Sequence, residues 1–173
     1  VAALQTIATA HATCGTAALL PTLITDNFAR TAAAIDAVEA AINLGVAGII
    51  GIHLEGPHLS VARKGAHDPS LIRPMEQVDL DLLLSAASRI PNVMVTVAPE
   101  STTMTQISQL VEGGLTVSLG HTNANFETCI AAFDSGARCV THLFNAMSQL
   151  NNREPGLVGA AFVRDDVYAS MIA

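Results

Sequence analysis

The stretch GIHLEGPHLS, residues 51–60, places a carboxylate directly after an apolar run in a chain that carries few charges. The segment VAGIIGIHL, residues 46–54, predicts a buried strand, and Glu55 follows where that strand should end. A buried carboxylate is costly unless a partner compensates its charge. The end of this strand is therefore the first candidate for a functional site.

Segments with strand and helix patterns alternate along the rest of the chain. Strands are expected within residues 15–24, 46–54, 92–100, 115–121, 137–142 and 167–173. Helices are expected after a cap at Asp26 or Asn27, from Pro74, from a Thr103–Gln106 capping box, after a cap at Asn123, and near Val158. This alternation is typical of an α/β protein with a parallel sheet and crossover helices.

Two architectures fit the alternation. One is an open doubly wound sheet, and the other is part of a (β/α)8 barrel, which takes ~250 residues when complete. In both, ligands bind at the C-terminal ends of the strands. A loop from Glu55 to Ser70, long against the usual ~4–6 residues, is predicted to be a binding loop.

The composition disfavours several partners. Of the 173 residues, 50% are apolar and 13% are charged, which is typical of one folded domain. The net charge of −7 argues against binding to nucleic acid or to an anionic membrane. No apolar run approaches the ~18 residues that span a bilayer, and no signal-peptide pattern is present. Three cysteines without a CxxC motif predict reduced thiols and a cytoplasmic protein.

Charged and imidazole side chains end four consecutive predicted strands. They are Glu55, Glu100, His121 and His142. Two histidines and a carboxylate are the ligand set of a catalytic zinc or iron site, and water bound to such an ion becomes a nucleophile near neutral pH. The alternative, that each is an ordinary hydrogen-bonded polar group at a strand end, stays open on spacing alone.

Four motifs extend this pattern: HLEGPHLSVARKGAHDP (53–69), VTVAPE (95–100), SLGHTNANFE (118–127) and THLFNAMSQLNNREPGLVGA (141–160). Together, and in this order, they resemble the N-acetylglucosamine-6-phosphate deacetylase family of the amidohydrolase superfamily. The resemblance implies a metal-dependent TIM-type (β/α)8 barrel with a small accessory β domain. It also implies an enzyme that removes the acetyl group from N-acetylglucosamine 6-phosphate, giving glucosamine 6-phosphate and acetate.

The same resemblance assigns roles to individual residues. Glu55, His121 and His142 match the metal ligands of the family, with zinc as the expected ion and iron as an alternative. His67 matches a histidine that contacts the sugar. The positions that match phosphate contacts are Asn145, Ala146 and Arg153. Because family members are commonly dimers or tetramers, we expect a homo-oligomer in which that arginine can serve a neighbouring subunit.

By this resemblance, residues 1–173 are the central part of a barrel, about five to six βα units, without the accessory β domain and the C-terminal units. The general-base aspartate of the family lies on a later strand. Asp165 and Asp166, in the turn before the last predicted strand, are poor candidates for that role. No catalytic residue is assigned, and because loss of a general base costs ~10²–10⁴-fold in rate, we expect this chain alone to be nearly inactive.

Two other functions remain open. A non-catalytic remnant would keep a metal or sugar-phosphate site without chemistry. A metal-free phosphosugar isomerase or aldolase would need a basic group at a strand end, yet the only lysine is Lys64, in the long loop. Among the other histidines, we expect His53 to be a hydrogen-bonded core imidazole and His11 to lie in a helix, and His58 has no assigned role.

Overall fold

The computed structural model describes residues 1–172, so the end of the last predicted strand, Ala173, lies outside the described residues. Its strands are β1 (Thr22–Ile24), β2 (Ile52–Glu55), β3 (Val93–Val97), β4 (Thr116–Leu119), β5 (Cys139–Val140) and β6 (Tyr168–Ala169). Its α-helices are α1 (Ala2–Thr13), α2 (Phe28–Asn43), α3 (Gln77–Arg89), α4 (Met104–Glu112), α5 (Phe126–Asp134) and α6 (Gly156–Phe162). Two short 3-10 turns are η1 (Val61–Arg63) and η2 (Pro99–Ser101).

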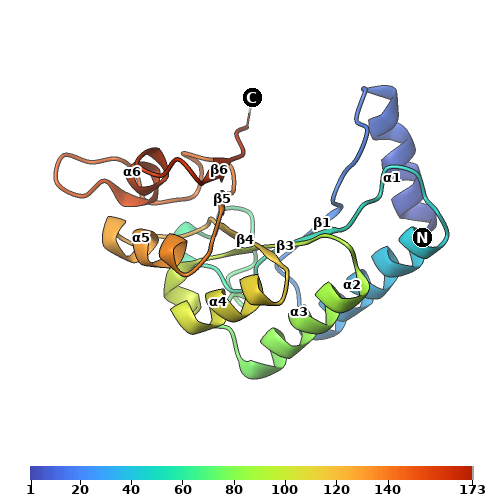
Figure 1. Ribbon diagram of the computed structural model, residues 1–173, viewed down its shortest axis with the longest axis horizontal. Coiled ribbons are helices and arrows are strands. Elements are labelled where there is room, and N and C mark those ends of the chain that lie inside the picture. Colours follow the sequence, from blue (N-terminus) through green and yellow to red (C-terminus); the bar gives the residue numbers. More distant parts are fainter. Residues whose placement is uncertain (173) are drawn as a thin grey trace.

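The six strands form one parallel sheet in the order β1-β2-β3-β4-β5-β6. Consecutive strands are neighbours throughout, whereas a doubly wound sheet reverses its strand order at a switch point. Helices α2 to α5 follow one another in an arc around the strands (Figure 1). The prediction of an incomplete (β/α)8 barrel is confirmed.

The core lies between the strands and the helices that surround them. In β2, the apolar side chains of Ile52 and Leu54 are buried, and the side chains of His53 and Glu55 alternate with them on the other face. This alternation places apolar groups against the helices and polar groups on the inner face of the barrel. Within residues 1–172, no helix combines the length and the apolar character that crossing a bilayer requires.

Three helix starts show how local capping sets the boundaries. The predicted cap at Asn27 is confirmed, because its side chain accepts a hydrogen bond from the backbone of Arg30. The predicted Thr103–Gln106 capping box is also confirmed. The start at Pro74 is wrong, because Glu76 and Asp79 form a capping box that begins α3 at Gln77.

The predicted cap at Asn123 is also wrong. The backbone N–H of Asn123 donates to Glu100, and its side chain accepts a hydrogen bond from Arg63, so it lies outside the helix. Asn125 caps α5 instead, with its side chain accepting from the backbone of Thr128. The expected strand at 46–54 is also shorter than predicted, since β2 begins at Ile52.

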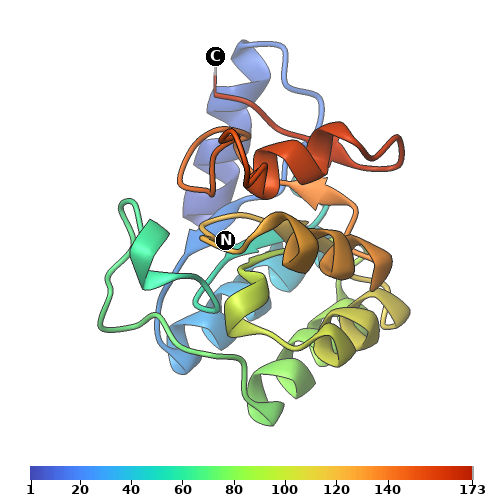
Figure 2. The same ribbon diagram turned by 90° about the vertical axis from the view of Figure 1, so that its left-hand side faces the viewer.

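The long loop after β2 is fixed above the ends of the strands. Figure 2 shows this loop and η1 on the left of the molecule. The backbone N–H of Ser60 donates to the carbonyl of His121 at 2.8 Å. The backbone N–H of Ala98 donates to the carbonyl of His58, also at 2.8 Å. The loop therefore spans β2, β3 and β4 on the side where the candidate site residues emerge.

Candidate metal centre

Glu55, His121 and His142 converge at the C-terminal ends of β2, β4 and β5. The Oε1 atom of Glu55 lies 3.0 Å from Nε2 of His121 and 3.0 Å from Nε2 of His142. The two Nε2 atoms are also 3.0 Å apart. The three side chains that the sequence predicted to lie together therefore present one donor atom each to a common point.

The outer nitrogens of the two imidazoles fix which ring nitrogen carries the proton. Nδ1 of His121 lies 2.8 Å from the carbonyl oxygen of Arg63, and Nδ1 of His142 lies 3.0 Å from that of Asn145. A carbonyl oxygen only accepts, so each Nδ1 is the protonated atom. In the neutral rings, both Nε2 lone pairs then point at each other and at a carboxylate. This arrangement needs a positive charge at its centre, from protons or from a metal ion.

The backbone at both histidines is in the left-handed region. His121 has φ of +46° and His142 has φ of +40°. Residues other than glycine are uncommon there, and such strain of ~1–3 kcal/mol persists only where surrounding contacts hold it. Here the backbone N–H of His142 donates to the hydroxyl of Ser170, and the Nδ1 contacts hold both rings. The strain turns both imidazoles toward Glu55.

The electrostatics of the centre favour an ionised carboxylate. In the metal-free centre, burial, the largest single influence, raises the pKa of Glu55, but the hydrogen bonds that His121 and His142 donate when protonated on Nε2 outweigh it and hold that pKa well below its usual range. The hydrogen bond to Glu55 raises the pKa of His142 against the effect of its burial. A carboxylate that stays negative at all physiological pH values is suited to a cation.

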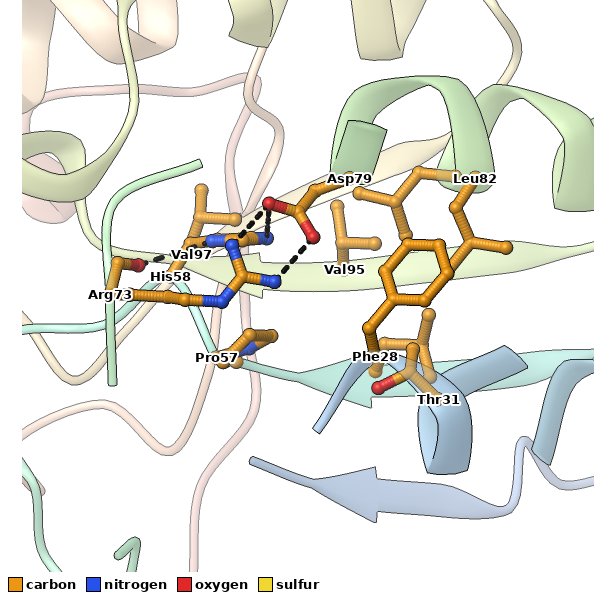
Figure 3. A pocket seen from close by; sticks show the side chains of 12 residues that line it. Phe28, Thr31, Pro57, His58, Arg73, Asp79, Leu82, Val95 and Val97 are labelled. Carbon is orange, nitrogen blue, oxygen red and sulfur yellow. Dashed lines mark hydrogen bonds and ion pairs between the residues drawn. The ribbon is translucent and has the colours of Figure 1, made fainter. Parts of the chain in front are cut away.

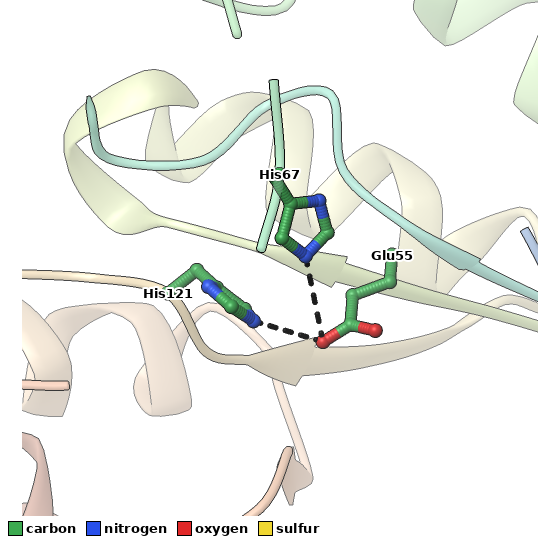
Figure 4. Close-up of side chains that lie close together, drawn as sticks. All are labelled: Glu55, His67 and His121. Atoms are coloured by element: carbon green, nitrogen blue, oxygen red, sulfur yellow. Dashed lines mark hydrogen bonds and ion pairs between the residues drawn. The ribbon is translucent and has the colours of Figure 1, made fainter. Parts of the chain in front are cut away.

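His67 lies beside these three residues, but its imidazole carries its proton on a different ring nitrogen from those of His121 and His142. Its Nε2 is 4.0 Å from Oε1 of Glu55, and its ring meets that of His121 edge-on with centroids 4.4 Å apart (Figure 4). Its Nδ1 lies 2.7 Å from the hydroxyl of Thr25 and accepts from the backbone N–H of the same residue at 3.3 Å. The neutral ring then carries its proton on Nε2, where it faces the centre as a donor.

A second grouping of possible ligands replaces His142 with His67. The ligand atoms of Glu55, His67 and His121 lie within 4.8 Å of one another. The grouping with His142 is tighter, at 3.0 Å for each pair, and it consists of lone pairs only. His67 is accordingly placed to contact a molecule at the centre rather than to hold an ion.

The remaining predicted site residues lie on the segment that follows His142 in the sequence. Asn145 contacts His142 through its carbonyl, and Ala146, with φ of +50°, follows it. Arg153 is exposed in the loop before α6. Asp166, a poor candidate for the general base on sequence grounds, is bound by Arg164 at the surface.

Two other strand-end residues have structural contacts. His53 lies between the hydroxyls of Thr22 and Thr96, at 3.0 and 2.7 Å, as expected for a core imidazole. Glu100 accepts hydrogen bonds from the hydroxyl of Thr122 and the backbone of Asn123. The contacts of Thr25 and of the Arg63 carbonyl were not predicted, because backbone groups and a single threonine give no distinctive sequence signal.

The strands form an incomplete parallel barrel, and two imidazoles and a carboxylate lie at their C-terminal ends. This arrangement is typical of a barrel enzyme that can hold a metal ion. Comparison with known proteins narrows this class. The chain is 48% identical to N-acetylgalactosamine-6-phosphate deacetylase of Shewanella over 94% of its length, and 37% identical to N-acetylglucosamine-6-phosphate deacetylase of Haemophilus influenzae over 91%.

Solved structures give the same family. N-acetylglucosamine-6-phosphate deacetylase from Pasteurella multocida matches 91% of the chain at 35% identity with a TM-score of 0.84. A variant of the enzyme from Mycobacterium smegmatis, in complex with N-acetyl-D-glucosamine 6-phosphate, matches 90% at 36% identity with a TM-score of 0.82. No protein-family model matches the chain.

The predicted family resemblance is therefore confirmed: the chain shares its sequence and its fold with the N-acetylhexosamine-6-phosphate deacetylases. It spans about two-fifths of the length of these relatives, 41% of each curated relative named above. The share of the two solved structures that it covers is nearly the same, 41% and 40%.

Proposed function

We propose that Glu55, His121 and His142 hold a divalent metal ion. The observation that carries the proposal is the set of three 3.0 Å separations between Oε1 and the two Nε2 atoms. Protons alone suit this centre poorly, because two imidazolium rings in such contact repel each other. If only one ring is protonated, the lone pair of the other still faces a carboxylate. A metal ion satisfies all three atoms together.

Zinc is the ion that this ligand set favours, with iron as the alternative. Imidazole nitrogens and one carboxylate oxygen are typical of catalytic zinc sites, in which three protein ligands leave a further position for water. The second contacts of both rings, to backbone carbonyls, match the outer hydrogen bonds that orient histidine ligands.

In the proposed reaction, Glu55, His121 and His142 would hold an ion whose chemistry would be to acidify a water molecule and polarise the acetyl carbonyl. The chain's own residues supply the geometry. Glu55 stays ionised because of its imidazole neighbours, and the carbonyls of Arg63 and Asn145 keep both Nε2 lone pairs directed inward. The Nε2–H of His67 faces the same point and can donate to a sugar hydroxyl.

We propose that the whole protein removes the acetyl group from N-acetylglucosamine 6-phosphate, giving glucosamine 6-phosphate and acetate. N-acetylgalactosamine 6-phosphate is a second candidate substrate, because the relative that is 48% identical is named for it. The phosphate contacts are proposed for Asn145, Ala146 and Arg153, where an arginine fork suits a phosphate. We further propose a cytoplasmic homo-oligomer.

General acid–base chemistry needs a group that we do not assign among the described residues. We therefore propose that the 173-residue chain alone is inactive or nearly so, a deficit of ~10²–10⁴-fold or more. The alternative of a non-catalytic protein that keeps a metal or sugar-phosphate site would apply to the whole protein only if its complete sequence also lacks such a base.

The test is acetate release by the complete protein, loaded with Zn²⁺, from the two epimeric N-acetylhexosamine 6-phosphates. We expect turnover of at least one epimer and its loss in Glu55→Gln. The unphosphorylated sugars serve as controls for the phosphate contacts. Lack of acetate release from both phosphorylated sugars by a zinc-loaded protein would reject the deacetylase proposal and favour the non-catalytic alternative.

A further inference from the structure

A chain of hydrogen-bonded polar side chains, exposed at Thr22 and buried from Thr96 onward, connects five neighbouring strand segments that precede or carry the proposed metal ligands. The hydroxyl of Thr22 lies 3.0 Å from Nδ1 of His53, and Nε2 of His53 lies 2.7 Å from the hydroxyl of Thr96. The hydroxyl of Thr96 contacts that of Thr141 at 2.7 Å, which in turn contacts that of Ser118 at 2.7 Å. We call these five residues the polar layer.

Thr22 and His53 are direct register partners, but two other contacts of the polar layer follow the stagger of a barrel. His53 is the register partner of Met94, yet it contacts Thr96, two residues further along β3. Ser118 is the register partner of Cys139, yet it contacts Thr141, again two residues further. Contacts that step forward in this way connect side chains at one level of tilted barrel strands.

Each proposed metal ligand follows a member of the polar layer on its own strand. Glu55 comes two residues after His53, and His121 comes three residues after Ser118. His142 comes directly after Thr141. Thr96, on the strand between β2 and β4, connects the segment of Glu55 to the segments of the two histidines.

Hydroxyl and imidazole side chains are unusual in the inner layers of a parallel barrel. The inner layers of such barrels are filled mainly by branched apolar residues. Here Thr96 and Ser118 are completely buried, and Thr141 is 7% exposed. Within the described residues, no buried side-chain nitrogen or oxygen atom lacks a hydrogen-bond partner. A fully satisfied polar network fixes one arrangement of its members, whereas apolar contacts allow small slips.

We propose that the polar layer positions the three metal ligands by fixing how far β2, β4 and β5 are shifted along the barrel axis relative to one another. The inference rests on the metal site proposed above. Thr96 is its central positioning residue, because its hydroxyl alone connects the imidazole on β2 with the hydroxyls that precede His121 and His142. Loss of that hydroxyl leaves all three ligand side chains present, but their positions relative to one another become less well fixed.

The test replaces zinc with Co²⁺, whose visible absorption reports coordination geometry, in the complete protein. Thr96→Val removes the hydroxyl at nearly constant volume, and Thr96→Ser restores it. Ser118→Ala removes only the last contact of the layer and is the milder second variant. Thr31→Val is the matched control, because Thr31 is also buried and donates its hydroxyl hydrogen bond to the carbonyl of Asn27, the cap of α2.

We expect Thr96→Val to bind Co²⁺ about tenfold more weakly than the wild type, as for other groups that orient metal ligands, and with an altered absorption band. Ser118→Ala should shift the band in the same direction, Thr96→Ser should restore it, and Thr31→Val should lower the melting temperature only. Wild-type spectra and affinity in both Thr96→Val and Ser118→Ala would overturn the positioning role. Failure of the wild type itself to bind Co²⁺ would overturn the metal site, and the positioning role with it.

Discussion

At the scale of single residues, the centre depends on two histidines whose backbone is strained. His121 and His142 follow their strands after a glycine and a threonine, and each turns through the left-handed region to direct Nε2 toward Glu55. That conformation costs ~1–3 kcal/mol per residue. The carbonyls of Arg63 and Asn145 compensate it by holding the rings.

A second polar cluster, with a buried carboxylate and imidazole, lies where the long loop meets α3. Arg73 donates two hydrogen bonds of 2.5 Å to the two carboxylate oxygens of Asp79 (Figure 3). Nδ1 of His58 donates to the carbonyl of Arg73 at 3.2 Å, and its Nε2 is 4.0 Å from Asp79. The histidine that had no role in the sequence analysis therefore helps to fix the loop.

The Asp79 carboxylate should make the folded protein sensitive to acid. Burial, the largest influence, raises its pKa, but hydrogen bonds from Arg73 and the backbone of Glu76 outweigh it and leave the pKa below its ordinary value. A lowered folded-state pKa stabilises the fold above the unfolded value of ~3.9 and loses that stability as pH falls through the folded value. We expect Asp79→Asn to lower the free energy of unfolding by about 3 kcal/mol at pH 7.

The measurement is thermal or urea unfolding of the wild type and Asp79→Asn between pH 7 and pH 2.5. The difference between the two should shrink below pH 4, because the carboxylate becomes protonated first in the unfolded chain and only at lower pH in the folded protein. Asp81→Asn, on the same helix and exposed, is the control and should change stability little. A difference that stays constant down to pH 2.5 would contradict this account of the ion pair.

The sequence predicted the members of the centre but not their surroundings. Strand ends placed Glu55, Glu100, His121 and His142 on one side of a barrel, and the family resemblance selected Glu55 and the two histidines among them. The backbone carbonyls that fix the tautomers of His121 and His142 were not predictable in this way, because every residue has a backbone carbonyl. His58 was missed because an isolated histidine in a loop does not indicate which partner it will find.

At the scale of elements, the loop between β2 and α3 packs against the imidazole of His121 at Gly65. A Cβ atom on this residue would lie 3.1 Å from Cε1 of His121, tighter than ordinary contact. Gly65 also has φ of +55°. The loop therefore presses directly on one of the proposed metal ligands, and a single methyl group should move it.

We expect Gly65→Ala to weaken metal affinity by about tenfold through displacement of His121. Gly114→Ala is the matched control, since Gly114 has φ of +88° and no atom within 4 Å of its would-be Cβ. Both variants bear a backbone cost of ~1–2 kcal/mol, so their melting temperatures should fall similarly. Chelator competition for the bound ion measures the difference, and equal metal affinities in the two variants would contradict the contact.

Element boundaries show where sequence reasoning stops being sufficient. Asn123 and Asn125 are both good capping residues, and the sequence pattern did not distinguish them. The choice falls on Asn125 because Glu100 and Arg63, both distant in sequence, bind Asn123. The existence of α5 was predictable from its own residues, whereas its first residue depends on tertiary contacts.

At the scale of the whole molecule, the described sheet has two edges. Neither β1 nor β6 has a strand on its outer side among residues 1–172. Large apolar side chains are exposed at both edges, including Ile24 in β1 and Tyr168 in β6. Unpaired strand edges with apolar side chains favour association with other chains.

We expect the 173-residue chain, purified alone, to self-associate. Sedimentation or size-exclusion measurements should give a mass that exceeds the 17.9 kDa of one chain and rises with concentration. Replacing Ile24 and Tyr168 by lysine should shift the distribution toward monomer, because charge on an edge strand opposes pairing. A concentration-independent monomer for the unchanged chain would show that these edges are protected in another way.

The overall fold was more predictable than its details. Alternating strand and helix patterns indicated a parallel sheet, since a crossover between parallel strands needs a helix. They did not distinguish a doubly wound sheet from a barrel, because that choice depends on which strands become neighbours. The motif resemblance selected the barrel, and the strand order agrees with it.

The most direct test of the metal centre is the metal content of the purified protein. Elemental analysis after dialysis should find Zn²⁺ or another divalent ion bound to the wild type and to His11→Ala, whose histidine lies exposed on α1. His142→Ala should lose most of that ion, because it removes one of the three donor atoms. A wild type that binds no divalent ion, or a His142→Ala variant that binds it as tightly as His11→Ala, would contradict the account.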